Sequence, residues 1–427
     1  MKILIVTHYF PPYNSIASLR PYSWAKYWSR KGNEVTVLTT RKETSETDLN
    51  LDCTGFNIIA VDFLKEHDFL SKRYRFVSPT RSKGIDTAKK YTWSIRIKEY
   101  IARTGTVGAD CRFPNLYQFW VNKAVKRIKE ENTVYDVVVG SFAPFAALVI
   151  AIRLKKLGIA RKAVLDFRDL WVDNHIFKGL PLVGIYEKAL ERKFCTKADW
   201  LTTVSEPLAR NLRKKYGDKV TVILNGFDEK EPVKEADSGL DNNCVNIVYT
   251  GFIYEGHQDP SPLFKAVEML KQENYEFLSR LRLLFVGWCA DYVSKLLNVY
   301  PIGEYVQCEG FLPREQCILM QRDADILLFL DDKTEAGDGI LTGKLFEYMF
   351  SGSFIWSIGG RWQPSKMIET HQVGKAFGME VESIKNELKK LLSGEKAPKN
   401  NAACLSQLRM YTREYQADQM LTLLKNN

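Results

Sequence analysis

The sequence has no closely spaced cysteine pair and no histidine at the spacing of a zinc site. A disulfide framework and a zinc-binding module both need such clusters, so neither class of protein is indicated. The cysteines are therefore expected to be small buried side chains in a reducing compartment. They are scattered along the chain at Cys53, Cys111, Cys195, Cys244, Cys289, Cys308, Cys317 and Cys404.

Long hydrophobic runs are missing as well. The longest apolar stretch, Phe142–Ile152, is about half of the roughly 20 residues that a membrane-spanning helix needs, and it ends at Arg153. Met1–His8 carries one charge and a very short apolar run, which suits a buried first strand better than a signal peptide. These absences predict a soluble, cytoplasmic protein.

Several well-known motifs are absent too. No Gly-x-Gly-x-x-Gly follows the first predicted strand, and neither Gly-x-x-x-x-Gly-Lys-Ser/Thr nor His-Glu-x-x-His occurs. Dehydrogenase, P-loop NTPase and zinc-protease functions therefore lose their main sequence support. The chain also has no internal repeat of the solenoid kind and no low-complexity tract.

The sequence is long and carries a net positive charge. A chain of 427 residues is too long for one hydrophobic core to keep growing, so two domains are expected. Its 45% hydrophobic and 26% charged residues are ordinary for a globular protein and exclude a mainly disordered or fibrous chain. The net charge of +10 indicates a negatively charged partner of some kind.

The first forty residues predict a βαβ unit, with strands at 2–7 and 34–39. The helix between them is expected at about 15–31, capped by Asn14 or Ser15. Pro21 predicts a kink, or a helix that starts nearer residue 20. Apolar strands separated by helices indicate a parallel sheet covered on both faces. Further strands are expected at 134–140, 162–166, 199–204 and 219–224, and further helices at 144–156 and 205–215.

Residues 229–243 are polar and indicate a linker, after which a second α/β series begins. Two doubly wound domains place the expected ligand site in the cleft between them, at the carboxyl ends of the strands. The predicted domains are 1–228 and 244–404, followed by a terminal segment, 405–427, with a helix at 406–424. Strands are expected at 245–250, 281–286, 305–309, 325–330 and 354–358, and helices at 261–271, 291–298, 314–322 and 343–350.

The strongest candidate site is the segment Gly337–Gly352, which lies between two predicted apolar strands. Thr342 or Gly343 would cap a helix, Lys344 would lie in its first turn, and Glu347 one turn further on. Such a helix start can hold a diphosphate with backbone amides and an ammonium group, while a carboxylate accepts hydrogen bonds from a ribose diol. The alternative is an exposed Lys–Glu pair of little consequence.

A second candidate is the turn after the first strand, His8–Arg20, where Pro11 and Pro12 lead to small polar residues at the start of a helix. Backbone N–H groups near Ser15 could receive an anion there. The alternative is that the prolines only shape the loop.

Segments spread over nearly the whole chain resemble family 4 glycosyltransferases of the GT-B fold, in particular bacterial members that build capsule, O-antigen and exopolysaccharide. The resemblance keeps its order along the chain and is weakest between about residues 60 and 130. The segments are KILIVTHYFPP, ASLRPYSWAKYWSRKGNEVTVLTT, DFRDLWVDN, TTVSEPLARNL, VILNGFD, YTGFIYEGHQDPSPLFKAVEML and TGKLFEYMFSG.

The resemblance implies two Rossmann-like domains that face each other across a cleft and a final helix that crosses back to the first domain. It implies a UDP- or GDP-sugar donor held mainly by the C-terminal domain, an acceptor on the N-terminal side, retention at the anomeric carbon, and no required metal or cofactor. Glu347 corresponds to the glutamate that binds the donor ribose. Gly343, Lys344 and Leu345 correspond to the turn beside the diphosphate, and Gly251 to a glycine loop that approaches the phosphates.

On the N-terminal side, Asp166–Trp171 corresponds to the segment that lines the cleft. Arg168, Asp169 and His175 are candidates for orienting the acceptor or the leaving side of the sugar. The alternative is a buried ion pair that caps a strand. Ser15 is a candidate donor contact, although Asn14-Ser15 stands where the family commonly has a glycine pair.

Two further departures from the family pattern affect the donor site. The family often has a second glutamate eight positions before the ribose glutamate, where this chain has Gly339. It also tends to have a lysine in the loop after Gly251, where this chain has His257. Because histidine is largely neutral at pH 7, Lys344 is expected to carry more of the phosphate charge.

Residues 61–130 hold most of the charge surplus, with about 16 Lys or Arg against about 7 Asp or Glu. Interleaved aromatic residues suit an anionic membrane surface and a lipid-diphosphate-linked or oligosaccharide acceptor. A peripheral protein at the inner face of the cytoplasmic membrane is therefore predicted. The alternatives are a solvated surface with its own small core and, more remotely, a basic nucleic-acid-binding protein, for which no recognition motif is present.

Taken together, these features predict a retaining glycosyltransferase of surface polysaccharide biosynthesis. Two alternatives keep the fold but change the chemistry: a sugar-nucleotide epimerase, and a non-catalytic sugar-nucleotide-binding protein, which Gly339 brings into consideration.

Overall fold

The computed structural model of the chain describes residues 1–42, 49–62, 111–113, 115, 117–174, 181–228, 237–399 and 406–426. The chain forms two compact units, and each is built around one parallel sheet. Unit 1 contains Met1–Leu224 and Gln416–Asn427, and unit 2 contains Asn225–Tyr415.

Unit 1 has a seven-stranded sheet with the order β3-β2-β1-β4-β5-β6-β7. Its neighbouring strands are parallel, and the central strands are almost continuously apolar because helices cover both of their faces. The strands are β1 (Lys2–Val6), β2 (Glu34–Thr40), β3 (Asn57–Val61), β4 (Tyr135–Phe142), β5 (Ala160–Phe167), β6 (Trp200–Thr203) and β7 (Val220–Val222).

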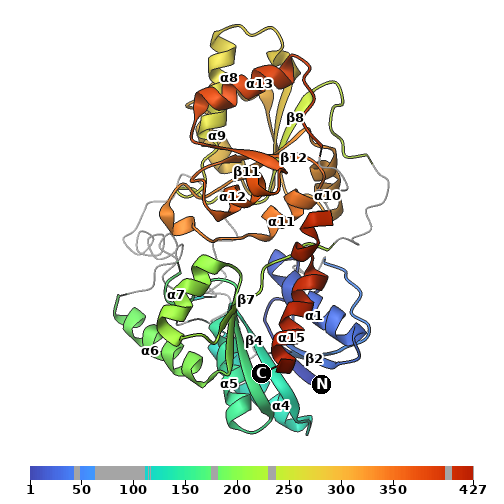
Figure 1. Cartoon of the computed structure of the whole chain (residues 1–427), viewed down its shortest axis with the longest axis vertical. Coiled ribbons are helices and arrows are strands. Elements are labelled where there is room, and N and C mark those ends of the chain that lie inside the picture. The colour runs from blue at the N-terminus through green and yellow to red at the C-terminus, as the bar shows by residue number, and fades with distance from the viewer. Residues whose placement is uncertain are drawn as a thin grey trace, which may run out of the picture. The chain divides into compact units, whose positions relative to one another are not determined.

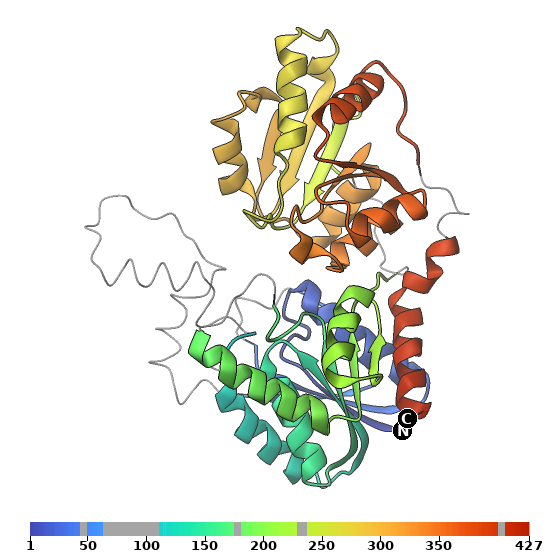
Figure 2. The ribbon, with the colours of Figure 1, turned by 60° about the vertical axis from the view of Figure 1, so that its left-hand side comes forward.

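Helices pack on both faces of this sheet (Figure 1). On one face, α1 and the part of α15 that belongs to unit 1 share a core containing Trp24, Trp28, Met420 and Leu424. The other face carries α4, α5, α6 and α7 (Figure 2). The helices are α1 (Ile16–Arg30), α4 (Gln118–Glu130), α5 (Phe145–Lys156), α6 (Pro181–Lys197), α7 (Glu206–Tyr216) and α15 (Arg413–Asn426).

The start of α1 follows from a local cap. The Ser15 side chain accepts a hydrogen bond from the Ala17 backbone N–H at 3.2 Å, which satisfies one of the unpaired donors of the first turn. Pro21 lies inside the helix, so the alternative start near residue 20 is wrong. Further along, the Trp24 and Trp28 rings are stacked with centroids 5.6 Å apart, and Trp28 Nε1 donates to the Ala417 carbonyl at 2.8 Å.

Unit 2 has a six-stranded parallel sheet with the order β10-β9-β8-β11-β12-β13. This order and that of unit 1 confirm the predicted pair of doubly wound sheets. The strands are β8 (Val245–Thr250), β9 (Leu281–Val286), β10 (Val306–Glu309), β11 (Ile326–Leu330), β12 (Phe354–Ile358) and β13 (Gly374–Gly378). The α-helices are α8 (Ser261–Gln272), α9 (Ala290–Leu297), α10 (Arg314–Asp323), α11 (Gly343–Phe350), α12 (Gln363–Thr370) and α13 (Val381–Leu392), and the short 3-10 helices are η3 (Leu278–Arg280), η4 (Gly303–Tyr305), η5 (Glu335–Gly337) and η6 (Leu408–Tyr411).

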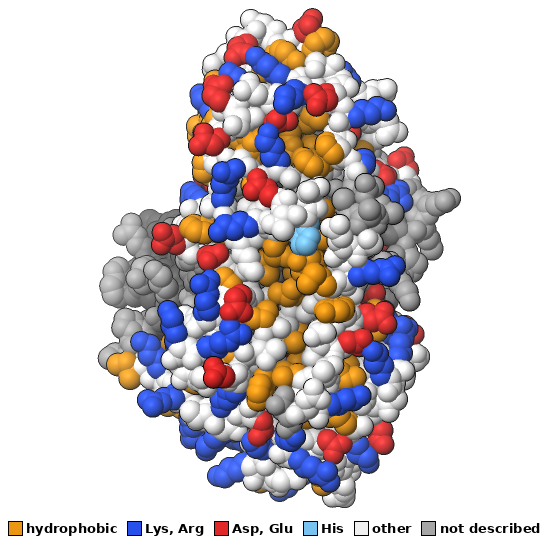
Figure 3. Space-filling view, in the orientation of Figure 1, with side chains coloured by type: hydrophobic (Ala, Val, Ile, Leu, Met, Phe, Trp, Pro, Cys, Tyr) orange, Lys and Arg blue, Asp and Glu red, His pale blue; other side chains and the backbone are white. Residues whose placement is uncertain are grey.

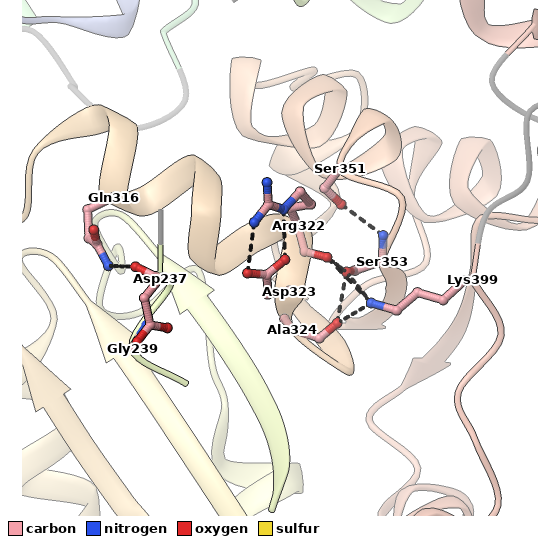
Figure 4. Close-up of polar contacts among 9 residues, drawn as sticks. All are labelled: Asp237, Gly239, Gln316, Arg322, Asp323, Ala324, Ser351, Ser353 and Lys399. Atoms are coloured by element: carbon pink, nitrogen blue, oxygen red, sulfur yellow. Dashed lines mark hydrogen bonds and ion pairs between the residues drawn. The ribbon is translucent and has the colours of Figure 1, made fainter. Parts of the chain in front are cut away.

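The segment after α13 is tied to the end of α10 (Figure 4). Lys399 Nζ donates to the Ala324 carbonyl at 2.7 Å and to Ser353 Oγ at 2.9 Å, and Ser353 Oγ donates to the same carbonyl at 2.8 Å. The last carbonyls of a helix have no partner inside the helix, so a lysine at that place satisfies them. On the other side of α10, Gln316 Nε2 donates to the Ser238 carbonyl at 2.9 Å.

The predicted linker is only partly described, because residues 229–236 lie outside the described residues. Its second part, residues 237–243, belongs to unit 2 and is held there by the Gln316 contact.

The last helix begins later than predicted. Thr412 has an extended backbone and forms a parallel bridge with Phe227, and α15 starts at Arg413. The predicted continuous helix from residue 406 is therefore wrong, because the bridge takes Thr412 out of helical conformation. Among the described strands and α-helices, those that the sequence analysis did not assign are β3, α4, α6, α12, β13 and α13.

Candidate functional site

In unit 2, two of the predicted donor residues come together at the carboxyl end of β8. Gly251 follows this strand with φ at +118°, and a β-carbon there would lie 2.9 Å from Lys344 Nζ. Lys344 belongs to the first turn of α11, about 90 residues further along the chain. The backbone conformation at this position favours glycine, and a β-carbon there would displace the end of the Lys344 side chain.

The Lys344 ammonium lies over the Tyr249 ring, 3.9 Å from its centroid. Burial lowers the pKa of Lys344 to about 7, although Cys289 and Glu347 nearby act in the opposite direction. Among the residues that the structure describes, no carboxylate lies within ion-pair distance of this ammonium group. An anion beside Lys344 would favour its charged form, and a diphosphate is such an anion.

Glu347 lies one helical turn after Lys344 and does not pair with it. Its Oε1 is 2.8 Å from Arg314 Nη2 and 3.9 Å from Arg413 Nη2, and its side chain is 14% exposed. The expected alternative of an exposed Lys–Glu pair is therefore wrong. The carboxylate is a largely buried, arginine-held acceptor, which suits a hydrogen bond to a hydroxyl group.

The other two residues of the predicted turn, Gly343 and Leu345, differ in their exposure to a ligand. Gly343 opens α11 after Thr342, whose backbone is extended and whose side chain makes no capping bond. Leu345 is fully buried, and its backbone N–H donates to the Thr342 carbonyl at 3.2 Å. Gly343 and Lys344 are therefore better placed than Leu345 to contact a ligand.

His257 is held by a carboxylate in the loop that follows β8. Its Nδ1 lies 2.9 Å from Asp332 Oδ2, and its carbonyl accepts from the Lys333 backbone N–H at 2.8 Å. The loop after β8 is thereby fastened to the loop after β11.

Gly339 lies in the loop before α11 with φ at +86°. Its neighbour Asp338 accepts a long hydrogen bond, 3.4 Å, from the Gln363 backbone N–H at the start of α12. Position 339 therefore offers no side-chain carboxylate to a sugar ring, because glycine has no side chain.

The sequence analysis missed a row of exposed aromatic residues at the same edge of the sheet. Trp288 is 65% exposed and Phe311 60% exposed, and each follows a glycine directly after a strand. The two turns are neighbours, because the Gly287 N–H donates to the Glu309 carbonyl at 3.0 Å. The repeated glycine-aromatic pair after β8, β9 and β10 is the sequence signal that could have found them. The pairs are Gly251-Phe252, Gly287-Trp288 and Gly310-Phe311.

In unit 1, the structure describes two of the three candidates after β5. Arg168 Nε donates to the Phe142 carbonyl at 2.9 Å, and its guanidinium carbon lies 5.1 Å from the centroid of the Tyr9 ring. Asp169 is exposed, and His175 lies outside the described residues. Arg168 and Asp169 do not form the buried ion pair that was the alternative interpretation.

The buried ion pair of this segment involves Asp166 instead. Arg20 Nη2 is 2.7 Å from Asp166 Oδ1, and both side chains are nearly or completely buried. Ser141 and Thr202 donate further hydrogen bonds to the same carboxylate, at 3.1 and 2.8 Å. Asp166 therefore joins β4, β5, β6 and α1.

His8, at the carboxyl end of β1, is a second group that the sequence analysis did not single out. Its Nδ1 lies 2.8 Å from Thr40 Oγ1, and its Nε2 lies 3.0 Å from Tyr117 Oη. Burial, together with the charges of Lys42 and Arg168, holds the pKa of His8 well below its ordinary value. Lys42 and Arg168 are far apart in the sequence, so no local sequence pattern reveals that both charges act on this imidazole. Ser15, the predicted donor contact of this unit, accepts the capping hydrogen bond of α1 with its hydroxyl oxygen.

No helix among the described residues is both long and apolar enough to cross a membrane. No group of three or more His, Cys, Asp or Glu side chains among them is arranged to hold a metal ion.

Comparison with solved structures identifies the fold. Sucrose-phosphate synthase from Thermosynechococcus elongatus superposes with a TM-score of 0.64 at 12% identity, covering 100% of this chain and 98% of that chain. TarM gives 0.63 at 11% identity over 99% and 98%, and WaaG, a glycosyltransferase involved in lipopolysaccharide biosynthesis, gives 0.53 at 16% identity over 98% and 94%. At such identities the likeness concerns the fold alone, and that fold is GT-B.

Residues 21–231 match the family described as Glycosyltransferase Family 4. Comparison with curated protein sequences gave no match. The N-terminal part of the chain thus resembles glycosyltransferase family 4, and the chain has the GT-B fold.

Proposed function

We propose that the chain is a glycosyltransferase that moves a sugar from a nucleoside diphosphate sugar to a lipid-linked saccharide acceptor, with retention at the anomeric carbon, during synthesis of a surface polysaccharide. The observation that carries the donor half is the Lys344 ammonium beside Gly251, without a carboxylate partner among the described residues. Two structural neighbours give support of a general kind. WaaB is a lipopolysaccharide outer core galactosyltransferase, and TarM from S. aureus has been solved with UDP and a GlcNAc-glycerol.

The proposed chemistry needs one strong electrostatic contact. When the bond between the anomeric carbon and the β-phosphate oxygen breaks, negative charge collects on the phosphate and the sugar becomes oxocarbenium-like. The acceptor hydroxyl forms the new bond on the same face, and its proton leaves to a phosphate oxygen. Lys344 and the backbone amides near Gly251 and Gly343 would stabilise the departing diphosphate, which is electrostatic catalysis that requires no metal.

The remaining donor contacts follow from the positions of Glu347 and the aromatic row. A ribose diol would donate to the Glu347 carboxylate, which Arg314 holds in place. Arg314 is three residues after Phe311, so a base attached to that ribose would lie near the exposed rings of Phe311 and Trp288. Stacking on such rings tolerates several bases, so it does not select between UDP and GDP.

On the acceptor side we propose that Arg168, Asp169 and His175 orient the acceptor. The electropositive surroundings of His8 and Arg168 suit an acceptor that carries phosphate. The proposed contact with the inner face of the cytoplasmic membrane was based on residues 61–130. Of these, 63–110, 114 and 116 lie outside the described residues.

A thermal-shift panel tests the donor half of this proposal. UDP, GDP and their sugar conjugates are compared with inorganic pyrophosphate, and at least one nucleoside diphosphate should stabilise the chain more than pyrophosphate does. No stabilisation by any nucleotide would contradict the proposal. Incubation of the donor with and without acceptor then separates the alternatives, because an epimerase converts the donor alone and a transferase needs the acceptor.

The Glu347→Gln variant tests the ribose contact. Loss of a charge-assisted hydrogen bond costs about 1.5–3 kcal/mol, so the dissociation constant of the nucleoside diphosphate should rise roughly ten- to hundredfold. Glu315→Gln, an exposed residue of the neighbouring helix α10, is the matched control and should bind as the wild type does. Unchanged binding and turnover of the Glu347→Gln variant would remove the ribose assignment.

A further inference from the structure

A groove runs between the helices that cover one face of the sheet of unit 1. It has a volume of about 390 Å³ and is bordered by α4, α5 and α6. Its wall contains Phe145 and Val149 of α5, Leu190 and Phe194 of α6, and Val121 of α4. None of its lining residues is acidic. The others are Phe113, Gln118, Asn122, Ile152, Arg153, Lys156, Tyr186, Lys193 and Lys197.

The groove is apolar at one end and cationic at the other. Helices α5 and α6 run in the same direction, because each connects neighbouring parallel strands of the sheet. Phe145 and Tyr186 come from their first halves. Arg153 and Lys156 come from the last turn of α5, and Lys197 comes from the last turn of α6, with Lys193 four residues before it. All four basic lining residues are exposed.

The charges at the cationic end are not neutralised by the part of the chain that the structure describes. Lys156, Lys193 and Lys197 have no carboxylate of a described residue within ion-pair distance, and Arg153 Nη1 donates to the Asn122 side chain at 2.7 Å. Figure 3 shows Lys and Arg side chains gathered at the lower left, where α6 and α7 lie in Figure 1. The groove therefore combines an apolar wall with an uncompensated positive end.

The length of the groove matches one leaflet of a membrane. From Tyr186 to Lys197, α6 rises roughly 16 Å at 1.5 Å per residue. The hydrocarbon core of a bilayer is about 30 Å thick, so one acyl chain spans about 15 Å of it. An amphiphile with one extended chain and an anionic head group would match both the length and the charge arrangement.

We propose that this groove binds one acyl chain of an anionic phospholipid of the membrane surface, with the lipid phosphate at Arg153, Lys156, Lys193 and Lys197. The apolar chain replaces water along Val149, Leu190 and Phe194, and the four cations neutralise the head group. This inference extends the membrane part of the proposed function, but it can be measured whether or not sugar is transferred.

Sedimentation with lipid vesicles tests the charged end. Vesicles of phosphatidylglycerol and phosphatidylcholine are compared with vesicles of phosphatidylcholine alone, and the wild-type chain should bind only the first kind. Lys193→Glu with Lys197→Glu should weaken this binding at least tenfold. Lys366→Glu with Lys396→Glu makes the same charge change at exposed sites of unit 2 and should alter binding less than twofold.

Tryptophan quenching tests the apolar wall. In the Phe194→Trp variant, phosphatidylglycerol with brominated acyl chains should quench emission more than it does in the wild type, because the added ring faces the chain. Equal vesicle binding by the two charge-reversed variants would overturn the proposal, and so would identical quenching of Phe194→Trp and wild type. A concentration-dependent dimer without vesicles that Lys193→Glu with Lys197→Glu abolishes would assign the groove to a second copy of this chain and equally overturn the proposal.

Discussion

At the scale of single residues, the surroundings of Lys344 act on its charge in opposite directions. The Tyr249 ring stabilises its charge and burial penalises it, while Glu347, one turn away, is engaged by Arg314. The charged and titratable groups around it are Glu347 on its own helix and Cys289 before α9, with the Tyr249 hydroxyl on β8. Because the pKa of Lys344 is lowered to about 7, its protonation should respond to a bound anion near neutral pH.

Donor binding should therefore be linked to proton uptake. A diphosphate raises the pKa of Lys344 above its free value of about 7, so the complex binds more protons than the free chain above that pH. Affinity is then highest below the free pKa and falls as pH rises through it, by at most about tenfold per pH unit. Calorimetry at pH 8 in two buffers of different ionisation enthalpy should detect up to one proton taken up.

The Lys344→Arg variant is the control for this prediction. Arginine stays charged at every pH in this range, so its binding of the nucleoside diphosphate should change little between pH 7 and 9. An equally steep pH dependence in both proteins would show that another group takes up the proton.

At the scale of elements, the structure depends on backbone contacts between segments that are far apart in the sequence. The predicted cap at Ser15 and the strands β8, β9 and β12 match the sequence expectations, because caps and apolar runs are local signals. The start of α15 was wrong, because Thr412 forms a bridge with Phe227, which is almost 190 residues earlier. No local pattern around Thr412 indicates that partner.

Gly226 shows how close this approach is. A β-carbon there would lie 2.7 Å from the Arg413 backbone N and 2.8 Å from the Tyr411 carbonyl oxygen. Gly226→Ala should therefore separate the two segments and destabilise unit 2 by about 1–3 kcal/mol, as overpacking does elsewhere. Urea unfolding measures the change. Gly303→Ala, where a β-carbon meets no atom within 4 Å, is the matched control, and an equal loss in both variants would contradict this explanation.

At the scale of the whole molecule, the chain finishes unit 1 only after it has completed unit 2. Residues Gln416–Asn427 count with unit 1, where Met420, Leu421 and Leu424 are buried in the core beside Trp28. The Leu224 backbone N–H also donates to the Gln416 side chain at 2.8 Å. Unit 1 therefore depends on residues that lie almost 200 positions after its last strand.

A chain that ends at Tyr415 should lose stability in unit 1 and keep it in unit 2. The three buried side chains contribute roughly 1.5–3 kcal/mol each, so the loss should reach about 5–9 kcal/mol. Hydrogen exchange should become faster in β1 and β4 and remain unchanged in β8 and β11. Leu424→Ala keeps the helix and should show the same pattern with a cost of about 2–5 kcal/mol. Equal acceleration in both units would contradict the assignment of α15 to unit 1.

Much of the molecule was predictable from the sequence by itself. Apolar strands alternating with helices determined two parallel sheets, and the segment Gly343–Glu347 marked a candidate donor site, because such patterns act over one or two helical turns. The tertiary structure alone decided which groups meet within each unit. In unit 2, Lys344 lies beside Gly251 and Glu347 pairs with Arg314, and in unit 1 the charges of Lys42 and Arg168 act on His8. Their charges and pKa values depend on burial and on neighbours far along the chain, and only folding brings those together.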